Sequence, residues 1–105
     1  MKSIIHGLRY DTDKAVLIGW DGYNGNRTDF EWWEAGLYKT PRSGRYFLAG
    51  KGGPMTRWAQ PVGTNGYTGG SGIVPMTAEE AREWAEQYLD AAEIEAGFAA
   101  TIADA

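Results

Sequence analysis

Glycine and aromatic residues together constrain what this chain of 105 residues can fold into. It contains 15 glycines, about twice the ordinary share of ~7%, together with 5 Trp, 6 Tyr and 3 Phe. So many rings exclude a disordered chain, and so much glycine excludes a coiled coil. The composition predicts strands and turns around a core of large flat side chains. The length allows a single domain, residues 1–105, whose tail over 98–105 is expected to fray.

Two hairpins are predicted in the first half of the chain. Residues 4–10 place two apolar-rich arms around His6 and Gly7, a two-residue turn in which glycine accepts a positive φ. The stretch from Phe30 to Ala49 holds two runs of β-forming residues around the turn Pro41-Arg42-Ser43-Gly44. The second hairpin is the stronger prediction, because its arms are longer and its turn is more distinctive.

The other segments before residue 77 are interpreted from their Gly, Pro and capping residues. After the first hairpin we expect one or two helical turns capped by Asp11 or Thr12, then a segment 16–20 that the pattern leaves undecided between helix and strand, and then a loop over 21–26. After the second hairpin we expect a break of the sheet at 50–54 and a helical turn over 55–60 stopped by Pro61. A flexible loop over 63–72 and a short strand at 73–74, ended by Pro75, complete this part of the chain.

The clearest helix signal lies in the last third. Thr77-Ala78-Glu79-Glu80 has the spacing of a capping box, which predicts one helix over 77–96 with Gly97 as its stop. The apolar stripe of this helix is Ala81, Trp84, Ala85, Tyr88 and Ala92, and the opposite face carries Glu79, Glu83, Glu86, Asp90 and Glu93. The predicted fold class is therefore α+β: a small antiparallel sheet with this amphipathic C-terminal helix packed on one face.

Nothing in the sequence indicates an enzyme. There is no Cys and a single His, His6, so a His-based triad, a thiol nucleophile and a two-His metal site are all excluded. The glycine-rich segments 50–53 and 63–72 lack the Gly-Lys-Ser/Thr ending of a phosphate loop, and carboxylate pairs such as Asp29/Glu31 are common on surfaces. We expect no cofactor and no metal. The lack of a secretory signal or membrane span indicates a cytoplasmic protein.

Charge is divided unevenly along the chain. Residues 1–72 hold nine Lys and Arg and six Asp and Glu, for a net +3, whereas residues 73–105 hold one and eight, for −7. A segment this acidic repels nucleic acid and attracts basic surfaces. Two interpretations stay open: a solvated helix face that confers solubility, and a docking surface for a basic partner.

The spacing of the carboxylates gives the second interpretation a physical form. They repeat about every 5 Å along the helix axis, on the scale of the phosphates of one nucleic-acid strand, which lie about 3.4 Å apart. A Lys- and Arg-lined groove built for nucleic acid is therefore a suitable partner. The predicted partner-binding residues are Glu79, Glu83, Glu86 and Asp90, with Tyr23 and Tyr67 in the glycine-rich loops as aromatic anchors.

An alternative function is a small nucleic-acid-binding module that uses the basic hairpin Lys39–Arg45. The basic residues there are Lys39, Arg42 and Arg45, and the interleaved rings are Tyr38, Tyr46 and Trp58. A basic stripe with stacking rings is the minimum needed to bind single-stranded nucleic acid. The competing interpretation is a polar hairpin end whose rings turn to the core.

A series of short motifs can be followed along the chain: Ile4-Ile5-His6-Gly7, Tyr10-Asp11-Thr12, Asp29-Phe30, Leu37-Tyr38-Lys39-Thr40, Ser43-Gly44-Arg45-Tyr46-Phe47-Leu48, Gly50-Lys51-Gly52-Gly53, Ile73-Val74-Pro75-Met76-Thr77, Ala81 and Trp84. These motifs resemble those of a family of small proteins from phages and mobile elements. They follow in order from residue 4 to about residue 90. The chain departs from the family pattern at Pro41 and in its Ala-rich tail after Glu95.

This resemblance implies an α+β fold and a function. Some family members act as anti-CRISPR proteins on type I-C systems, which implies binding to the surveillance complex (Cascade) in the bacterial host cell. The expected function is then a non-enzymatic inhibitor that blocks the engagement of target DNA by that protein–RNA complex. No direct DNA binding is expected, a monomer is the default, and a glycan-acting or metal-dependent enzyme is the third and weakest alternative.

Overall fold

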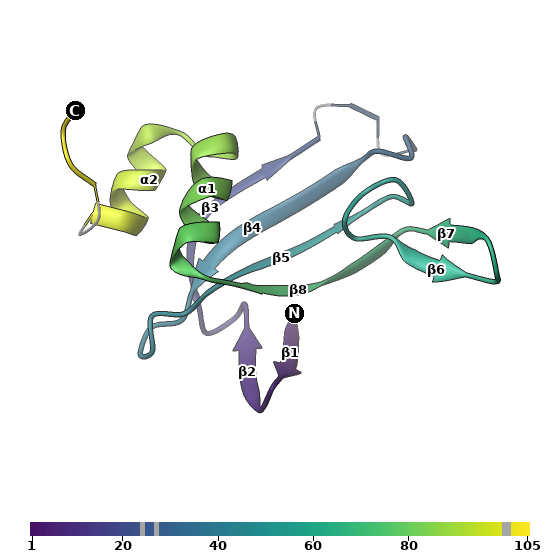
Figure 1. The fold of residues 1–105 in the computed structure, drawn as a ribbon, viewed down its shortest axis with the longest axis horizontal. Helices are drawn as coiled ribbons and strands as arrows, with labels where there is room; N and C mark the ends of the chain where they lie inside the picture. Colours follow the sequence, from purple (N-terminus) through teal and green to yellow (C-terminus); the bar gives the residue numbers. More distant parts are fainter. Residues whose placement is uncertain (24, 27, 100–101) are drawn as a thin grey trace.

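The structure, a computed structural model, describes residues 1–23, 25–26, 28–99 and 102–105. A four-stranded sheet runs in the order β3 (Val16–Gly22), β4 (Trp33–Lys39), β5 (Tyr46–Gly52) and β8 (Gly70–Met76), and each neighbouring pair is antiparallel. Two small hairpins, β1 (Lys2–Ile5) with β2 (Leu8–Asp11) and β6 (Gln60–Val62) with β7 (Gly66–Thr68), extend from this sheet (Figure 1). The helices α1 (Ala78–Tyr88) and α2 (Ala91–Phe98) follow. The α+β prediction is confirmed.

Both predicted hairpins are present. In the first, Ile5 pairs with Leu8, and the turn residues His6 and Gly7 have φ of 51° and 78°. Positive φ at both central residues gives the turn the twist that closes a two-residue hairpin. In the second, β4 and β5 pair from Lys39 opposite Tyr46 to Trp33 opposite Gly52. The undecided segment 16–20 is strand, since it forms most of β3.

The predicted loops and breaks around the glycines are largely wrong. The break expected at 50–54 comes only after Gly52, where β5 ends, so Gly50, Lys51 and Gly52 belong to the strand. The loop expected over 63–72 is the β6–β7 hairpin followed by the start of β8. The helical turns expected after Asp11 reduce to one turn over 12–14. In place of the helical turn expected over 55–60, the segment 54–58 forms only turns and a bend. Pro61, which was expected to stop that helical turn, lies within β6. Pro75 is accommodated within β8 because this is an edge strand, where a missing N–H costs little.

Gly50 shows why glycine continues the sheet here. A Cβ at this position would lie 2.5 Å from the Glu34 carbonyl oxygen and 2.7 Å from a ring carbon of Trp58. The glycine therefore makes room for the Trp58 indole, which is 4% exposed and belongs to the core. Gly50 therefore allows close packing, and β5 continues through this residue without a break.

Gly50→Ala is expected to lower the free energy of unfolding by about 1–3 kcal/mol, the usual cost of overpacking. Gly72, which pairs with Gly50 across the strands, provides a matched control, because a Cβ added there would meet no atom of the described residues within 4 Å. Gly72→Ala should change the same free energy by less than about 0.5 kcal/mol. Urea unfolding followed by circular dichroism measures both, and equal losses in the two variants would contradict the packing role of Gly50.

The single helix predicted over 77–96 is wrong, because the chain breaks between α1 and α2. Leu89 and Asp90 have extended backbone, with ψ of 162° and 169°. Asp90 caps α2: its Oδ1 accepts the Glu93 N–H at 2.8 Å, and Glu93 Oε1 accepts the Asp90 N–H at 3.2 Å. This second capping box starts a new helix at the point where the first would have continued.

The tail prediction is also corrected at Phe98. This side chain is 4% exposed and stacks on Tyr46, with ring centroids 5.1 Å apart. Gly97 does not end the helix, and a Cβ there would lie 2.6 Å from Ile18. Close approach of α2 to β3 therefore requires glycine at 97, and α2 docks as part of the core.

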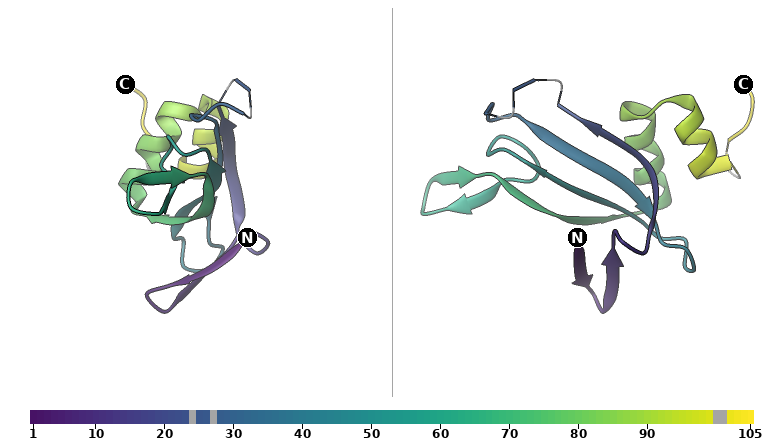
Figure 2. Two further views of the ribbon diagram at one scale, coloured as in Figure 1. Left: turned by 90° about the vertical axis from the view of Figure 1, so that its right-hand side faces the viewer. Right: turned by 180° about the vertical axis from the view of Figure 1, so that it is seen from behind.

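Two hydrophobic clusters cover the two faces of the sheet. The larger joins Leu37, Leu48 and Trp58 to Trp84 of α1 and Phe98 of α2. The smaller joins Phe47 and Ala49 to Tyr10 of the β1–β2 hairpin, and the Tyr10 and Phe47 rings meet edge to face at 5.4 Å. The left panel of Figure 2 shows both helices on one side of β3. Trp84 is buried as predicted, whereas Tyr88 is only half-buried.

Candidate functional site

Exposed carboxylates at steps of four and three residues form a row along α1, which we name the acidic face: Glu79, Glu83 and Glu86. Residues four and three apart share one side of a helix, and the seven-residue span places the outer two about 10 Å apart along the axis. The side of α1 turned to the sheet holds the buried residues Ala81, Trp84 and Ala85. The same helical period therefore builds the core contact and the acidic face.

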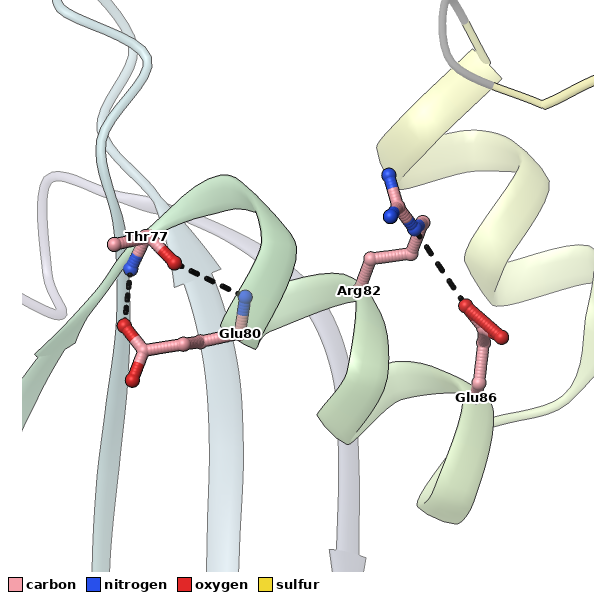
Figure 3. Close-up of polar contacts among 4 residues, drawn as sticks. All are labelled: Thr77, Glu80, Arg82 and Glu86. Carbon is pink, nitrogen blue, oxygen red and sulfur yellow. Dashed lines mark hydrogen bonds and ion pairs between the residues drawn. The ribbon is translucent and has the colours of Figure 1, made fainter.

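The remaining charges of α1 have partners on the helix (Figure 3). Glu80 closes the capping box: its Oε1 accepts the Thr77 N–H at 2.9 Å, and Thr77 Oγ1 accepts the Glu80 N–H at 3.1 Å. The bond from the Thr77 backbone holds the pKa of Glu80 below its ordinary value. Arg82 Nε lies 3.6 Å from Glu86 Oε1. Glu79 and Glu83 form no ion pair with any described residue, so they are the uncompensated charges of the acidic face.

Asp90 does not continue the acidic face in the way the sequence predicted. It is exposed, but its carboxylate caps α2, and Glu93 is half-buried and returns the capping bond. The five carboxylates expected on one continuous helix are thus split by the break at 89–90. Asp90 still adds a negative charge at the end of α1, next to the acidic face in the chain.

An aromatic cleft of about 490 Å³ opens beside the acidic face, and the sequence did not predict it. Its rings are Tyr23, Trp33, Trp58, Trp84 and Tyr88, and its other lining residues are Glu31, Met55, Thr56, Arg57 and Gln87. The Tyr88 ring lies 5.0 Å from both Trp33 and Trp84. Gln87 lines the cleft and follows Glu86 directly on α1, so the cleft and the acidic face share this helix.

The two predicted aromatic anchors lie in different places. Tyr23 is half-buried and forms part of the aromatic cleft. Tyr67 is 67% exposed on β7, in a hairpin that projects at the opposite end of the molecule from the helices (Figure 1). Tyr23 can therefore act together with the acidic face in a single contact, whereas Tyr67 belongs to a separate surface.

The rings of the basic hairpin are turned to the core. Tyr38 stacks on Phe47 with centroids 5.3 Å apart, Tyr46 stacks on Phe98, and Trp58 is buried. Lys39 Nζ lies 5.4 Å from the Tyr46 ring centroid, while Arg42 and Arg45 are exposed. Base stacking, which the alternative function requires, is thus not offered by these three rings.

Metal-ligating side chains do not gather at one point in the described part of the chain. No cluster of three or more His, Asp or Glu side chains there is placed to hold a metal ion. His6 is exposed in the turn of the first hairpin. Over the same residues, no helix has the length and apolar character needed to cross a membrane.

Comparisons with protein-family models, with curated proteins and with solved structures found no match to this chain. No residue role is therefore transferred from a relative. What the molecule binds is inferred from the charge and shape of its described surfaces.

Proposed function

We propose that this protein is a non-enzymatic inhibitor that binds a nucleic-acid-guided defence complex of the type I-C CRISPR class and blocks its engagement of target DNA. The observation that carries the proposal is the acidic face of α1, where Glu79 and Glu83 are exposed and unpaired among the described residues. The class of partner is inferred from the short motifs that, in their order along the chain, resemble a family of small phage proteins. The role of the acidic face is to occupy a basic groove that otherwise receives nucleic acid.

Electrostatics gives this contact both speed and selectivity. A cluster of one sign of charge steers a partner of the opposite sign over long range and raises the association rate. Of the eight charged side chains on and capping the helices from 78 to 98, only Arg82 is basic, and it pairs with Glu86. The helical end of the molecule therefore presents negative charge to a groove of Lys and Arg.

The aromatic cleft supplies the apolar part of the contact. Interfaces draw most of their binding energy from a few buried aromatic and Arg contacts surrounded by polar residues. Trp33, Tyr88 and Tyr23 offer partly exposed rings within a single cleft. A side chain of the partner that enters the cleft would be held next to the acidic face, so charge attraction and burial act together.

The function is tested with purified surveillance complex loaded with its guide RNA. The protein should co-elute with the complex in size-exclusion chromatography, and complex saturated with it should no longer retain labelled target DNA in a gel-shift assay. Guide-free protein subunits serve as a comparison that locates the partner. Unimpaired target binding by a complex exposed to excess protein would contradict the proposal.

The isolated protein is expected to show no measurable affinity for duplex DNA at physiological salt. The acidic helices repel the phosphates, and the rings of the basic hairpin are not available for stacking. Fluorescence anisotropy with a labelled duplex measures this directly. Micromolar binding that is lost when Lys39, Arg42 and Arg45 are neutralised would instead favour the nucleic-acid-binding module.

A further inference from the structure

A cleft of about 430 Å³ is lined by residues of β2, of the turn after it and of the β4–β5 turn. Figure 1 shows β2 and the β4–β5 turn below the helices. The lining residues of the cleft are Arg9, Asp11, Lys14, Ala15, Thr40, Pro41, Arg42 and Ser43. Three cations from three separate segments thus converge on one hollow that contains a single carboxylate. We name it the basic cleft.

The cations of the basic cleft differ from three others in the chain that have partners. Lys51 pairs with Glu34 at 3.2 Å, Arg82 pairs with Glu86, and Arg57 lies over the Trp58 ring at 5.7 Å. Arg9, Lys14 and Arg42 are exposed and form neither an ion pair nor a ring contact with any residue that the structure describes. Their charge is therefore available to an anion.

Hydroxyl groups add a directional donor to this charge. Thr40 Oγ1 accepts the Arg45 N–H at 2.9 Å, and Thr40 Oγ1 and Ser43 Oγ lie 2.8 Å apart, with either atom able to donate. Only one of the two hydroxyl groups donates its proton to the bond between Thr40 and Ser43. The other hydroxyl can therefore donate to a ligand, whichever of the two residues is the donor in that bond. Charge and a hydroxyl donor on one concave surface are the features that hold a phosphate oxygen.

We infer that the basic cleft binds the phosphate backbone of single-stranded RNA. This inference rests on the proposed function and extends it: the acidic face contacts protein in the defence complex, while the basic cleft contacts a stretch of its exposed guide RNA. The cleft lies on the side of the sheet covered by the β1–β2 hairpin, and the acidic face lies on helices that cover the other side. The two surfaces are therefore free to contact different components at the same time.

The occupant follows from the proposed function, because a guide RNA that has not yet paired with its target is a single strand. The lining of the basic cleft comes from β2, the turn after it and the β4–β5 turn. No exposed ring lines the basic cleft among the described residues, so the contact is to phosphates and is independent of base sequence. With three phosphates neutralised, affinity should fall with salt at a logarithmic slope of about −2 for a single strand.

The experiment titrates the full-length protein into a short labelled oligouridylate and follows fluorescence anisotropy. We expect saturable binding at about 50 mM salt that weakens about 20-fold by about 200 mM. The variant Arg9→Gln/Lys14→Gln/Arg42→Gln should bind at least about 10-fold more weakly. The matched control, Lys51→Gln/Arg57→Gln/Arg82→Gln, has the same net charge and should keep the wild-type affinity within about twofold, while circular dichroism confirms that both variants are folded.

Four outcomes would overturn the inference. They are the absence of saturable binding at protein concentrations up to about 100 µM, an equal loss in the two triple variants, tighter binding to duplex RNA than to the single strand, and equal binding to labelled polyglutamate. If RNA binding fails while the protein still co-elutes with the defence complex, the basic cleft is refuted and the proposed function stands. If RNA binding succeeds without co-elution, the proposed function is refuted and the basic cleft stands.

Discussion

Replacing Trp84 with alanine is expected to lower the free energy of unfolding by about 3–5 kcal/mol. The indole is 8% exposed and joins α1 to the large hydrophobic cluster on the sheet. It also packs against the Tyr88 ring at 5.0 Å, so its removal leaves a cavity between helix and sheet. Because small domains are stable by only about 5–15 kcal/mol, much of the variant should be unfolded near body temperature.

Urea denaturation followed by circular dichroism measures this change. Glu83→Ala, one residue away on the exposed side of α1, is the control and should alter stability by less than about 0.5 kcal/mol. A loss below about 1 kcal/mol for Trp84→Ala would contradict the packing of α1 on the sheet. Because Trp84 and Glu83 are neighbours on α1, comparing the two variants distinguishes the contribution of the buried side of the helix to stability from that of the acidic face.

The elements that the sequence predicted well are those with local signals. The hairpin turn at His6 and Gly7, the turn after Thr40 and the capping box at Thr77 each specify their structure within a few residues. Such signals act through backbone dihedrals and nearby hydrogen bonds. They require no knowledge of what packs against them.

The glycines were misjudged because their role depends on distant neighbours. Gly50 and Gly97 make room for Trp58 and Ile18, residues that approach only once the chain is folded. A glycine that breaks a strand and one that allows a close approach look the same in sequence. The strands through Gly50 and Gly70 could therefore not be distinguished from loops on local grounds.

The helix break had a signal that another pattern masked. Asp90-Ala91-Ala92-Glu93 has the spacing of a capping box, and the structure uses it as one. The same three-residue step also continues the series of carboxylates on α1. The sequence is therefore compatible both with one continuous helix and with a second capping box. The aromatic cleft had no comparable signal, because its rings come from segments that are brought together only by the sheet.

Reversing the charge of the acidic face is expected to weaken binding to the defence complex by at least about 100-fold. In Glu79→Lys/Glu83→Lys, attraction to a basic groove is lost and two like charges are placed against it. Such juxtaposition costs several kcal/mol at an interface, and each 1.4 kcal/mol is about a tenfold change in affinity. Folding stability should change by no more than about 1 kcal/mol, since both side chains are exposed and exposed charges contribute little.

The control must separate local charge from net charge. Asp13→Lys/Asp29→Lys makes the same change, from −4 to zero, at exposed positions outside the helices, so any effect on solubility or on general steering is matched. Surface plasmon resonance on immobilised complex should show wild-type affinity for this control and a wild-type association rate that falls with salt, because screening acts over about 8–10 Å. If both double variants bind equally well, the acidic face is not the contact. A folded Glu79→Lys/Glu83→Lys protein that still inhibits would then assign the contact to another surface, with the aromatic cleft and Tyr67 as the next positions to substitute.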